Sequence, residues 1–88
     1  MANIASQIKR NRQNEKRRQR NQSTRSEMKT RTRQALEAAE AGNADEAREA
    51  LRLAQQRIDT AAAKGVLHKR TAARRKSRLT RRVEELLG

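Results

Sequence analysis

The chain has 88 residues, a net charge of +13 and a mean hydropathy of −1.24, and 15 of its 29 apolar residues are alanine. Such a chain can build one small domain with a thin core, and its charge calls for a polyanionic partner. The absence of cysteine excludes disulfides and thiolate metal sites, and it is compatible with a location in the reducing cytosol. No apolar run approaches the roughly 18 residues of a membrane span, and the first ten residues lack the apolar core of a secretory signal, so we expect a cytoplasmic protein.

Proline is absent and only two glycines are internal, a composition that favours helix nearly throughout. Gly42 and Gly65 suit helix C-caps, which predicts three helices at about residues 4–41, 44–64 and 68–86. Asn43 with Glu46 three residues later is typical of an N-cap with a capping box at the start of the second helix. The net charge is +9 over residues 1–34, −3 over 35–60 and +7 over 61–88.

The first predicted helix changes character along its length. Its C-terminal part carries an apolar stripe at helical spacing, made of Met28, Thr32, Ala35, Leu36 and Ala39. Residues 9–27 contain no apolar side chain, and Arg10 and Arg17 project onto the same side as that stripe. This helix is roughly 55 Å long, against about 30 Å for each of the others, so its basic half overhangs the bundle. Repulsion between neighbouring cations predicts that this half frays in free protein and orders on binding.

The other two predicted helices are amphipathic. The apolar stripe of the second consists of Ala47, Ala50, Leu51, Ala54, Ile58, Ala61 and Ala62. The stripe of the third consists of Ala72, Leu79, Val83 and Leu86, with Arg70, Arg74, Arg78 and Arg81 on its reverse. Packing the three stripes together predicts an all-α fold, a three-helix antiparallel bundle with a long, overhanging basic first helix, in a single domain spanning residues 1–88.

No set of residues in the sequence has the composition of a catalytic or metal site. His68 is the only histidine, Cys, Tyr and Trp are absent, and no second metal ligand stands at a suitable spacing. Two roles are open to His68: capping the third helix or contacting a phosphate. There is also no glycine-rich phosphate loop. We therefore expect no enzymatic activity, no cofactor and no metal.

Basic residues gather in two blocks, and the denser one, residues 68–82, holds eight Lys or Arg in fifteen positions. Arg outnumbers Lys 17 to 6, which favours bidentate contacts with phosphates. A GC-rich coding sequence would also raise this ratio, but it would not cluster the residues. Polar side chains among the cations, such as Asn14 and Gln19, can bond phosphate, ribose or base edges. Since the chain has no aromatic ring for stacking on single strands, the pattern favours folded RNA recognised through its backbone and shape.

Three alternatives fit part of this pattern. A basic-zipper DNA binder needs three to four heptads after its basic region, and here the apolar repeat breaks at Gly42 and Asn43. A membrane-active cationic helix needs bulkier apolar anchors than alanine. A sequence-neutral nucleoid protein that binds duplex DNA through charge stays open, because electrostatics alone do not separate DNA from RNA.

Four segments of the chain resemble one family. MANIASQIKR at the start, the polar and basic run through SEMKTRTR, the EAGNADEA turn and KGVLHKRTAARRKSRL are similar to the S-twenty family of bacterial small-subunit ribosomal proteins. The resemblance implies a three-helix bundle with a long first helix, located in the small ribosomal subunit. It also implies direct, early binding to small-subunit ribosomal RNA, at the five-prime domain and the long stem near the three-prime end, with few protein contacts. Members of this family often have an aromatic residue in the middle of the bundle, and this chain has none.

Carried onto matching positions, the resemblance implies RNA contacts near both ends of the chain, from Asn3, Ser6, Lys9, Arg10, Lys16, Arg17, His68, Lys69, Ala72, Arg74, Lys76 and Ser77. The basic clusters add ten further candidates, Arg12, Arg18, Arg20, Arg25, Lys29, Arg33, Arg70, Arg75, Arg78 and Arg81. The expected role is structural. The protein would neutralise and clamp converging phosphates so that distant RNA segments can pack, and it would catalyse no reaction.

Overall fold

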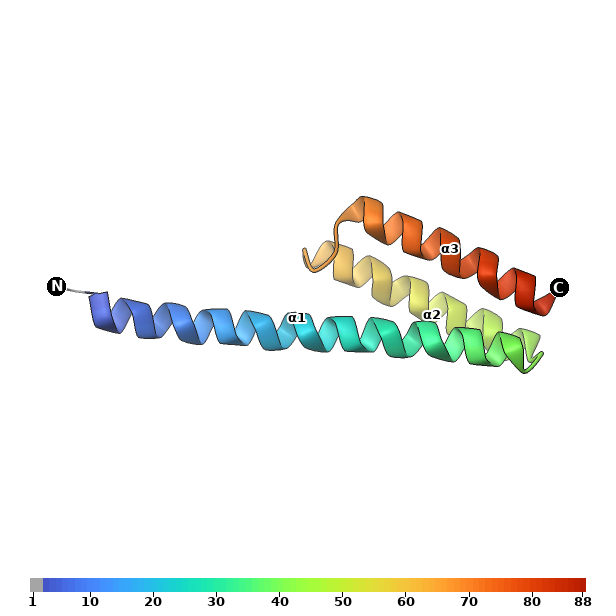
Figure 1. Cartoon of the computed structure of the whole chain (residues 1–88), viewed down its shortest axis with the longest axis horizontal. Coiled ribbons are helices and arrows are strands. Elements are labelled where there is room, and N and C mark those ends of the chain that lie inside the picture. The colour runs from blue at the N-terminus through green and yellow to red at the C-terminus, as the bar shows by residue number, and fades with distance from the viewer. Residues whose placement is uncertain (1–2) are drawn as a thin grey trace.

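The fold is all-helical, as the sequence predicted. The computed structural model describes residues 3–88, with side chains from residue 4 onward. Three helices follow one another, α1 (Asn3–Glu40), α2 (Ala44–Ala63) and α3 (Lys69–Leu87), and their bounds differ from the predicted ones by at most one residue. Each helix runs antiparallel to the one before it, and all three pack together where they overlap (Figure 1).

The first helix is unbroken over 38 residues, and its N-terminal part extends beyond the other two (Figure 1). At 1.5 Å per residue it is about 57 Å long, whereas α2 and α3, with 20 and 19 residues, are about 30 and 28 Å long. The described part of the chain measures 65 × 22 × 13 Å, and its radius of gyration of 17.5 Å exceeds the roughly 12 Å of a compact domain of this size. We call residues 3–20 of α1 the overhang.

The core is thin and rich in alanine. Among the side chains of residues 4–88, eleven buried apolar ones form one cluster, namely Met28, Ala35, Ala39, Ala47, Ala54, Ile58, Ala61, Val66, Ala72, Leu79 and Val83. The apolar stripes predicted for the three helices all face this cluster, so those predictions are confirmed. Alanines allow the helices to approach closely, but each buries only a methyl group, and Ile58 and Val83 are the largest side chains that are fully buried.

Two glycines end α1 and α2 in the same way, as the sequence predicted, although Gly65 lies one residue beyond the C-cap of α2, Lys64. Gly42 and Gly65 have φ of +78° and +76°, in the left-handed region that side chains with a Cβ rarely adopt. At the end of α2 the Gly65 N–H donates to the Ala62 carbonyl at 3.1 Å and the Val66 N–H donates to the Ala61 carbonyl at 2.9 Å. This pair of bonds is a Schellman motif, and the turn at Gly42 repeats it. The motif pairs two of the otherwise free carbonyls near the end of each helix.

The capping box predicted at the start of α2 is wrong in its bonding, although Asn43 does occupy the N-cap position. In a capping box Glu46 would accept from the Asn43 backbone N–H, but that N–H already donates to the Ala38 carbonyl at 3.1 Å. The Asn43 side chain makes no capping bond to the helix, and its amide instead donates to Glu46 Oε2 at 3.3 Å. The turn that ends α1 therefore takes the donor that a capping box would need.

Candidate nucleic-acid interface

The cations of the overhang are displayed to solvent rather than packed on the bundle. Every side chain from residue 4 to residue 23 is exposed, and Met28 is the first buried residue in the described part of the chain. Eight predicted contact residues lie in this stretch, Ser6, Lys9, Arg10, Arg12, Lys16, Arg17, Arg18 and Arg20. Because a helix directs successive side chains around its axis, phosphates can approach the overhang from several directions.

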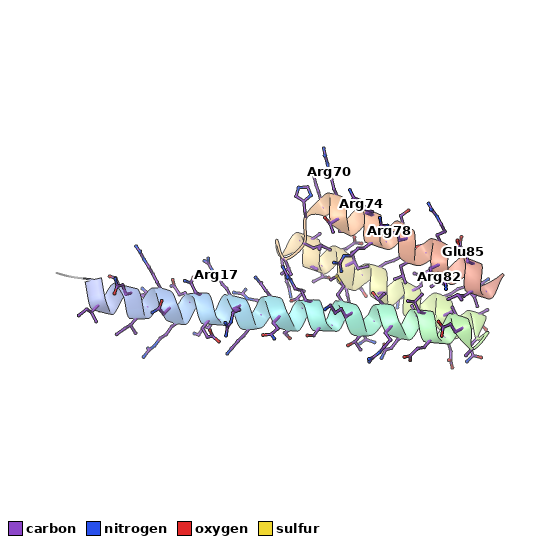
Figure 2. All side chains as sticks on the ribbon, viewed as in Figure 1. Arg17, Arg70, Arg74, Arg78, Arg82 and Glu85 are labelled. Atoms are coloured by element: carbon purple, nitrogen blue, oxygen red, sulfur yellow. The ribbon has the colours of Figure 1, made fainter. Side chains whose placement is uncertain are left out.

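The third helix presents a second cationic surface on its side away from the core. We call Arg70, Arg74, Arg78 and Arg81 the α3 cationic face, and all four are exposed while the opposite stripe is buried. Figure 2 shows Arg70 and Arg74 on the side of α3 that is turned away from α1. Three further predicted contact residues on α3 are exposed, Lys69, Arg75 and Ser77.

The second helix does not extend this basic surface, because its four acidic residues slightly outnumber its three basic ones. Arg52 donates two hydrogen bonds to the Glu49 carboxylate, at 2.6 and 3.2 Å. These bonds, and the attraction between the charges, lower the pKa of Glu49 and raise the pKa of Arg52. Excess positive charge is therefore confined to α1, α3 and the loop that joins α2 to α3.

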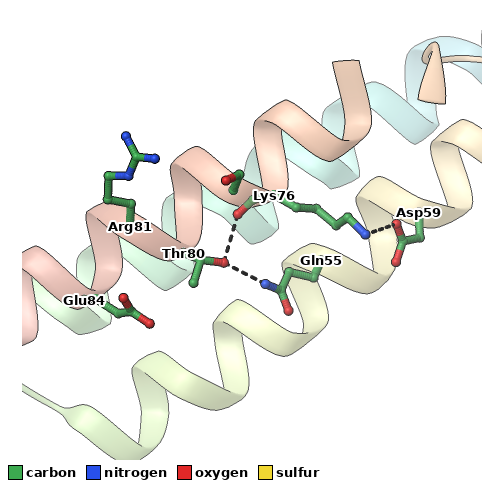
Figure 3. A pocket seen from close by; sticks show the side chains of 7 residues that line it. Gln55, Asp59, Lys76, Thr80, Arg81 and Glu84 are labelled. Atoms are coloured by element: carbon green, nitrogen blue, oxygen red, sulfur yellow. Dashed lines mark hydrogen bonds and ion pairs between the residues drawn. The ribbon is translucent and has the colours of Figure 1, made fainter. Parts of the chain in front are cut away.

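Among the predicted contact residues, Lys76 is engaged within the protein. Its Nζ lies 2.7 Å from Asp59 Oδ1 on α2, and beside this pair Gln55 Nε2 donates to Thr80 Oγ1 at 2.8 Å (Figure 3). Thr80 in turn donates to the Lys76 carbonyl at 2.9 Å. These contacts join α2 to α3 and hold the α3 cationic face in place. The Asp59 side chain is 58% exposed, so the ion pair is weak and a phosphate can compete for Lys76.

Three more predicted cations have partners within the chain. Arg18 and Arg33 each pair with an exposed glutamate about one turn away on α1, at 3.2 and 3.7 Å. Arg25 Nη2 donates to the Val66 carbonyl at 3.5 Å and so links α1 to the loop between α2 and α3. Within residues 4–88 the other predicted Lys and Arg side chains form no ion pair. Most of the cationic surface is therefore available to an external anion.

The only histidine caps α3, which is one of the two roles that the sequence left open. His68 has extended backbone angles, and its Nδ1 accepts from the Arg70 N–H at 3.1 Å. An accepting Nδ1 leaves the proton of the neutral ring on Nε2. Because the side chain is exposed, Nε2–H can donate to a phosphate while Nδ1 holds the cap. The two roles of His68 are thus compatible.

One residue that the resemblance placed at the interface lies elsewhere. Ala72 is 3% exposed and packs in the core, so its side chain is not displayed on the surface with the other predicted contact residues. The side chain of Asn3 falls outside the described residues. Across residues 3–88, no group of three His, Asp or Glu side chains is placed to hold a metal ion, and no helix has an apolar stretch that would cross a bilayer.

The structure adds Lys64 to the basic surface. Lys64 lines a hollow of about 410 Å³ together with Arg17, Arg20 and Asn21, where the overhang meets the end of α2. The sequence did not single out Lys64, because the antiparallel return of α2 is what brings it beside residues 17–21. One signal was available: the short turn after Glu40 and a second helix of 20 residues return the chain to about the level of residue 20 on α1.

Comparison with known proteins identifies the family of the chain. A family model described as ribosomal protein S20 matches residues 2–84. The chain belongs to this family. It is 54% identical to the small ribosomal subunit protein bS20 of Desulfotalea psychrophila over 88 residues, which cover all of this chain and 99% of that protein. The bS20 proteins of Beutenbergia cavernae and Salinispora tropica are 52% and 55% identical, over 98% and 94% of this chain and 100% and 94% of their own lengths.

Family membership confirms the resemblance seen in the four sequence segments. The chain is a structural protein of the small ribosomal subunit and not an enzyme. Membership also weakens the nucleoid-protein alternative, because the partner that a ribosomal protein meets is RNA.

Proposed function

We propose that the chain binds small-subunit ribosomal RNA directly and stabilises its folding during early assembly of the subunit. The observation that carries the proposal is the separation of cations from core: the apolar stripes face inward, while the overhang and the α3 cationic face remain exposed and largely unpaired. A surface of this kind attracts phosphates over a long range and gains binding free energy from the release of their counterions.

The long shape supports a clamping mechanism. The overhang can be surrounded by RNA, whereas the α3 cationic face meets RNA from one side of the bundle, so one 65 Å protein can contact two RNA segments at once. By neutralising phosphates on both segments, it lowers the repulsion that opposes their packing. The two regions proposed as partners, the five-prime domain and the long stem near the three-prime end, rest on the family resemblance alone.

Charge reversal on the third helix tests this proposal. The double variant Arg74→Glu and Arg78→Glu loses two charge-assisted contacts of about 1.5–3 kcal/mol each, so we expect at least a 100-fold loss of RNA affinity and no incorporation into reconstituted subunits. The matched control, Arg48→Glu and Arg52→Glu, makes the same charge change on α2 and should incorporate normally. Equal incorporation of both variants would defeat the assignment of α3 to RNA, and equal loss would mean that only total charge matters.

A further inference from the structure

We propose that Arg17, Arg20 and Lys64 form a phosphate clamp where the overhang meets the bundle, and that a backbone phosphate of the RNA bound there locks the overhang onto the bundle. The inference rests on the proposed function and extends it, because it names the ligand group, the site and the effect on the order of the protein. With Asn21, these three residues line the hollow described above, which we call the corner.

The corner is formed by α1 and the C-terminal end of α2. Arg17, Arg20 and Asn21 lie on α1 at the point where it leaves the bundle, and Lys64 is the C-cap residue of α2. Figure 1 shows this step, with α1 continuing past the loop that joins α2 to α3, and Figure 2 marks the position of Arg17 on the extending helix. A volume of about 410 Å³ gives room for a phosphodiester with its flanking sugars.

The charge of the corner requires an anion. Three cations and one amide line it, and none of its four lining residues is acidic. Arg17, Arg20 and Lys64 form no ion pair within residues 4–88. No carboxylate therefore offsets the repulsion among their charges across the corner. The guanidinium groups can bind phosphate oxygens through paired N–H donors, the lysine supplies a point charge, and the Asn21 amide offers a further donor.

The negative end of α2 is partly neutralised at this site, which weakens its repulsion of a phosphate. A helix C-terminus normally repels anions through its unpaired carbonyls. Here the Lys64 N–H bonds the Thr60 carbonyl at 3.0 Å, and the Schellman turn at Gly65 bonds those of Ala61 and Ala62. Arg25 also donates to the carbonyl of Val66 at 3.5 Å. The carbonyls of Thr60, Ala61, Ala62 and Val66 are therefore paired with donors, and among the described residues those of Ala63 and Lys64 accept no hydrogen bond.

A second hollow connects the corner to the surface of α1, which suits a polymeric ligand better than a lone anion. This larger hollow, of about 880 Å³, shares Arg17 and Asn21 with the corner and continues along the same helix past Arg25 to Lys29. An RNA strand that follows α1 can thus keep its phosphates in contact with cations as it passes into the corner. Successive phosphates of one strand, rather than a free phosphate ion, are the occupant that this continuity favours.

Binding at the corner has a structural consequence for the overhang. In free protein the repulsion between Lys64 and the two arginines disfavours docking of the last turn of the overhang, residues 17–20, against the end of α2. A phosphate between them replaces that repulsion by three attractive contacts, two with α1 and one with α2. Occupation of the corner should therefore protect the overhang from local unfolding.

Charge reversal at Lys64 separates this coupling from ordinary electrostatics. In Lys64→Glu the new carboxylate faces Arg17 and Arg20 and replaces the phosphate, so amide hydrogen exchange of residues 10–20 in free protein should slow by about two- to fivefold. Affinity for folded small-subunit ribosomal RNA should fall by about tenfold relative to the matched control Arg48→Glu, which lies on α2 toward the other end of the bundle. In Lys64→Ala the salt slope of binding should drop by roughly 0.7 to 0.9, the value for one phosphate.

Two results would overturn the clamp. One is that Lys64→Glu binds RNA with the same affinity as Arg48→Glu. The other is that amide exchange of residues 10–20 in free Lys64→Glu is as fast as in the parent protein. Failure of the proposed function looks different, because the parent protein itself would then show no preference for ribosomal RNA over scrambled RNA. Circular dichroism of each variant verifies that the bundle has folded before binding is compared.

Discussion

Truncation of Ile58 tests whether the three helices form a genuine bundle before RNA is present. Ile58 is 1% exposed and borders a groove that Thr32 and Leu36 of α1 and Leu79 of α3 also line, so all three helices meet there. The remainder of the core is mostly alanine, which gives the free protein few other large contacts. The consequence of Ile58→Ala should therefore be severe.

The expected loss of unfolding free energy follows from the carbon groups that the substitution removes. Ile58→Ala deletes three buried carbon groups worth about 0.8 kcal/mol each, or about 2.4 kcal/mol together. The cavity left behind raises the loss in unfolding free energy to about 3–4 kcal/mol, inside the usual range for this substitution. A domain of 88 residues is stable by roughly 4 to 13 kcal/mol, and an alanine-rich core belongs near the lower end. Free Ile58→Ala should thus be close to half unfolded.

The assay is urea unfolding followed by far-ultraviolet circular dichroism, because the chain has no aromatic residue for fluorescence. Ile4→Ala is the control, since it makes the same chemical change at a side chain that is 74% exposed and should alter the free energy by no more than about 0.5 kcal/mol. Ribosomal RNA should restore the fold of Ile58→Ala, because it binds the native state. If Ile58→Ala and Ile4→Ala unfold at the same urea concentration, the packed core inferred here does not exist in free protein.

Two further predictions concern single local contacts. Gly65→Ala should lower the unfolding free energy by about 1–2 kcal/mol through backbone strain alone, since φ is +76° and nothing lies within 4 Å of the added Cβ; an unchanged urea midpoint would mean that the Schellman turn is dispensable. Arg52 lowers the pKa of Glu49, so the pair stabilises the fold above the ordinary carboxyl range and this contribution is lost as pH falls through the lowered pKa. Arg52→Ala should shift the carboxyl titration of Glu49, followed by carbon-13 NMR, upward, and an unmoved midpoint would show that the contact does not persist in solution.

Most of the fold could be predicted from the helical spacing of the apolar residues. The apolar residues of α2 and α3 repeat at helical spacing and have no competing pattern, so their buried faces could be predicted residue by residue. The two internal glycines set the helix ends, because each sits where the chain must adopt positive φ. The loss of apolar residues before Met28 likewise predicted that α1 would leave the bundle. It did not predict that Arg25 and Glu27 still contact the bundle through polar bonds, to the Val66 carbonyl and to Arg57.

Contacts between helices were not predictable in the same way. The Asp59 and Lys76 pair depends on the rotation of α2 against α3, and neither helix alone records that rotation. Lys64 reaches the corner only through the register of α2 against α1. The capping box at Asn43 does not form because the Asn43 N–H donates to the Ala38 carbonyl of α1 instead. Local sequence rules thus gave the elements and their faces, while competition for partners decided the individual bonds.

The most direct test of direct ribosomal RNA binding is a salt-series titration of the protein with naked, folded small-subunit ribosomal RNA, using duplex DNA of equal length and scrambled RNA as competitors. If roughly eight phosphates are neutralised, log affinity should fall with log salt at a slope near −6 to −7. We predict that tight binding to the ribosomal RNA persists at salt concentrations that strip the protein from both competitors. Identical loss from all three nucleic acids would contradict shape-specific recognition and would mean that the charge of +13 acts generically.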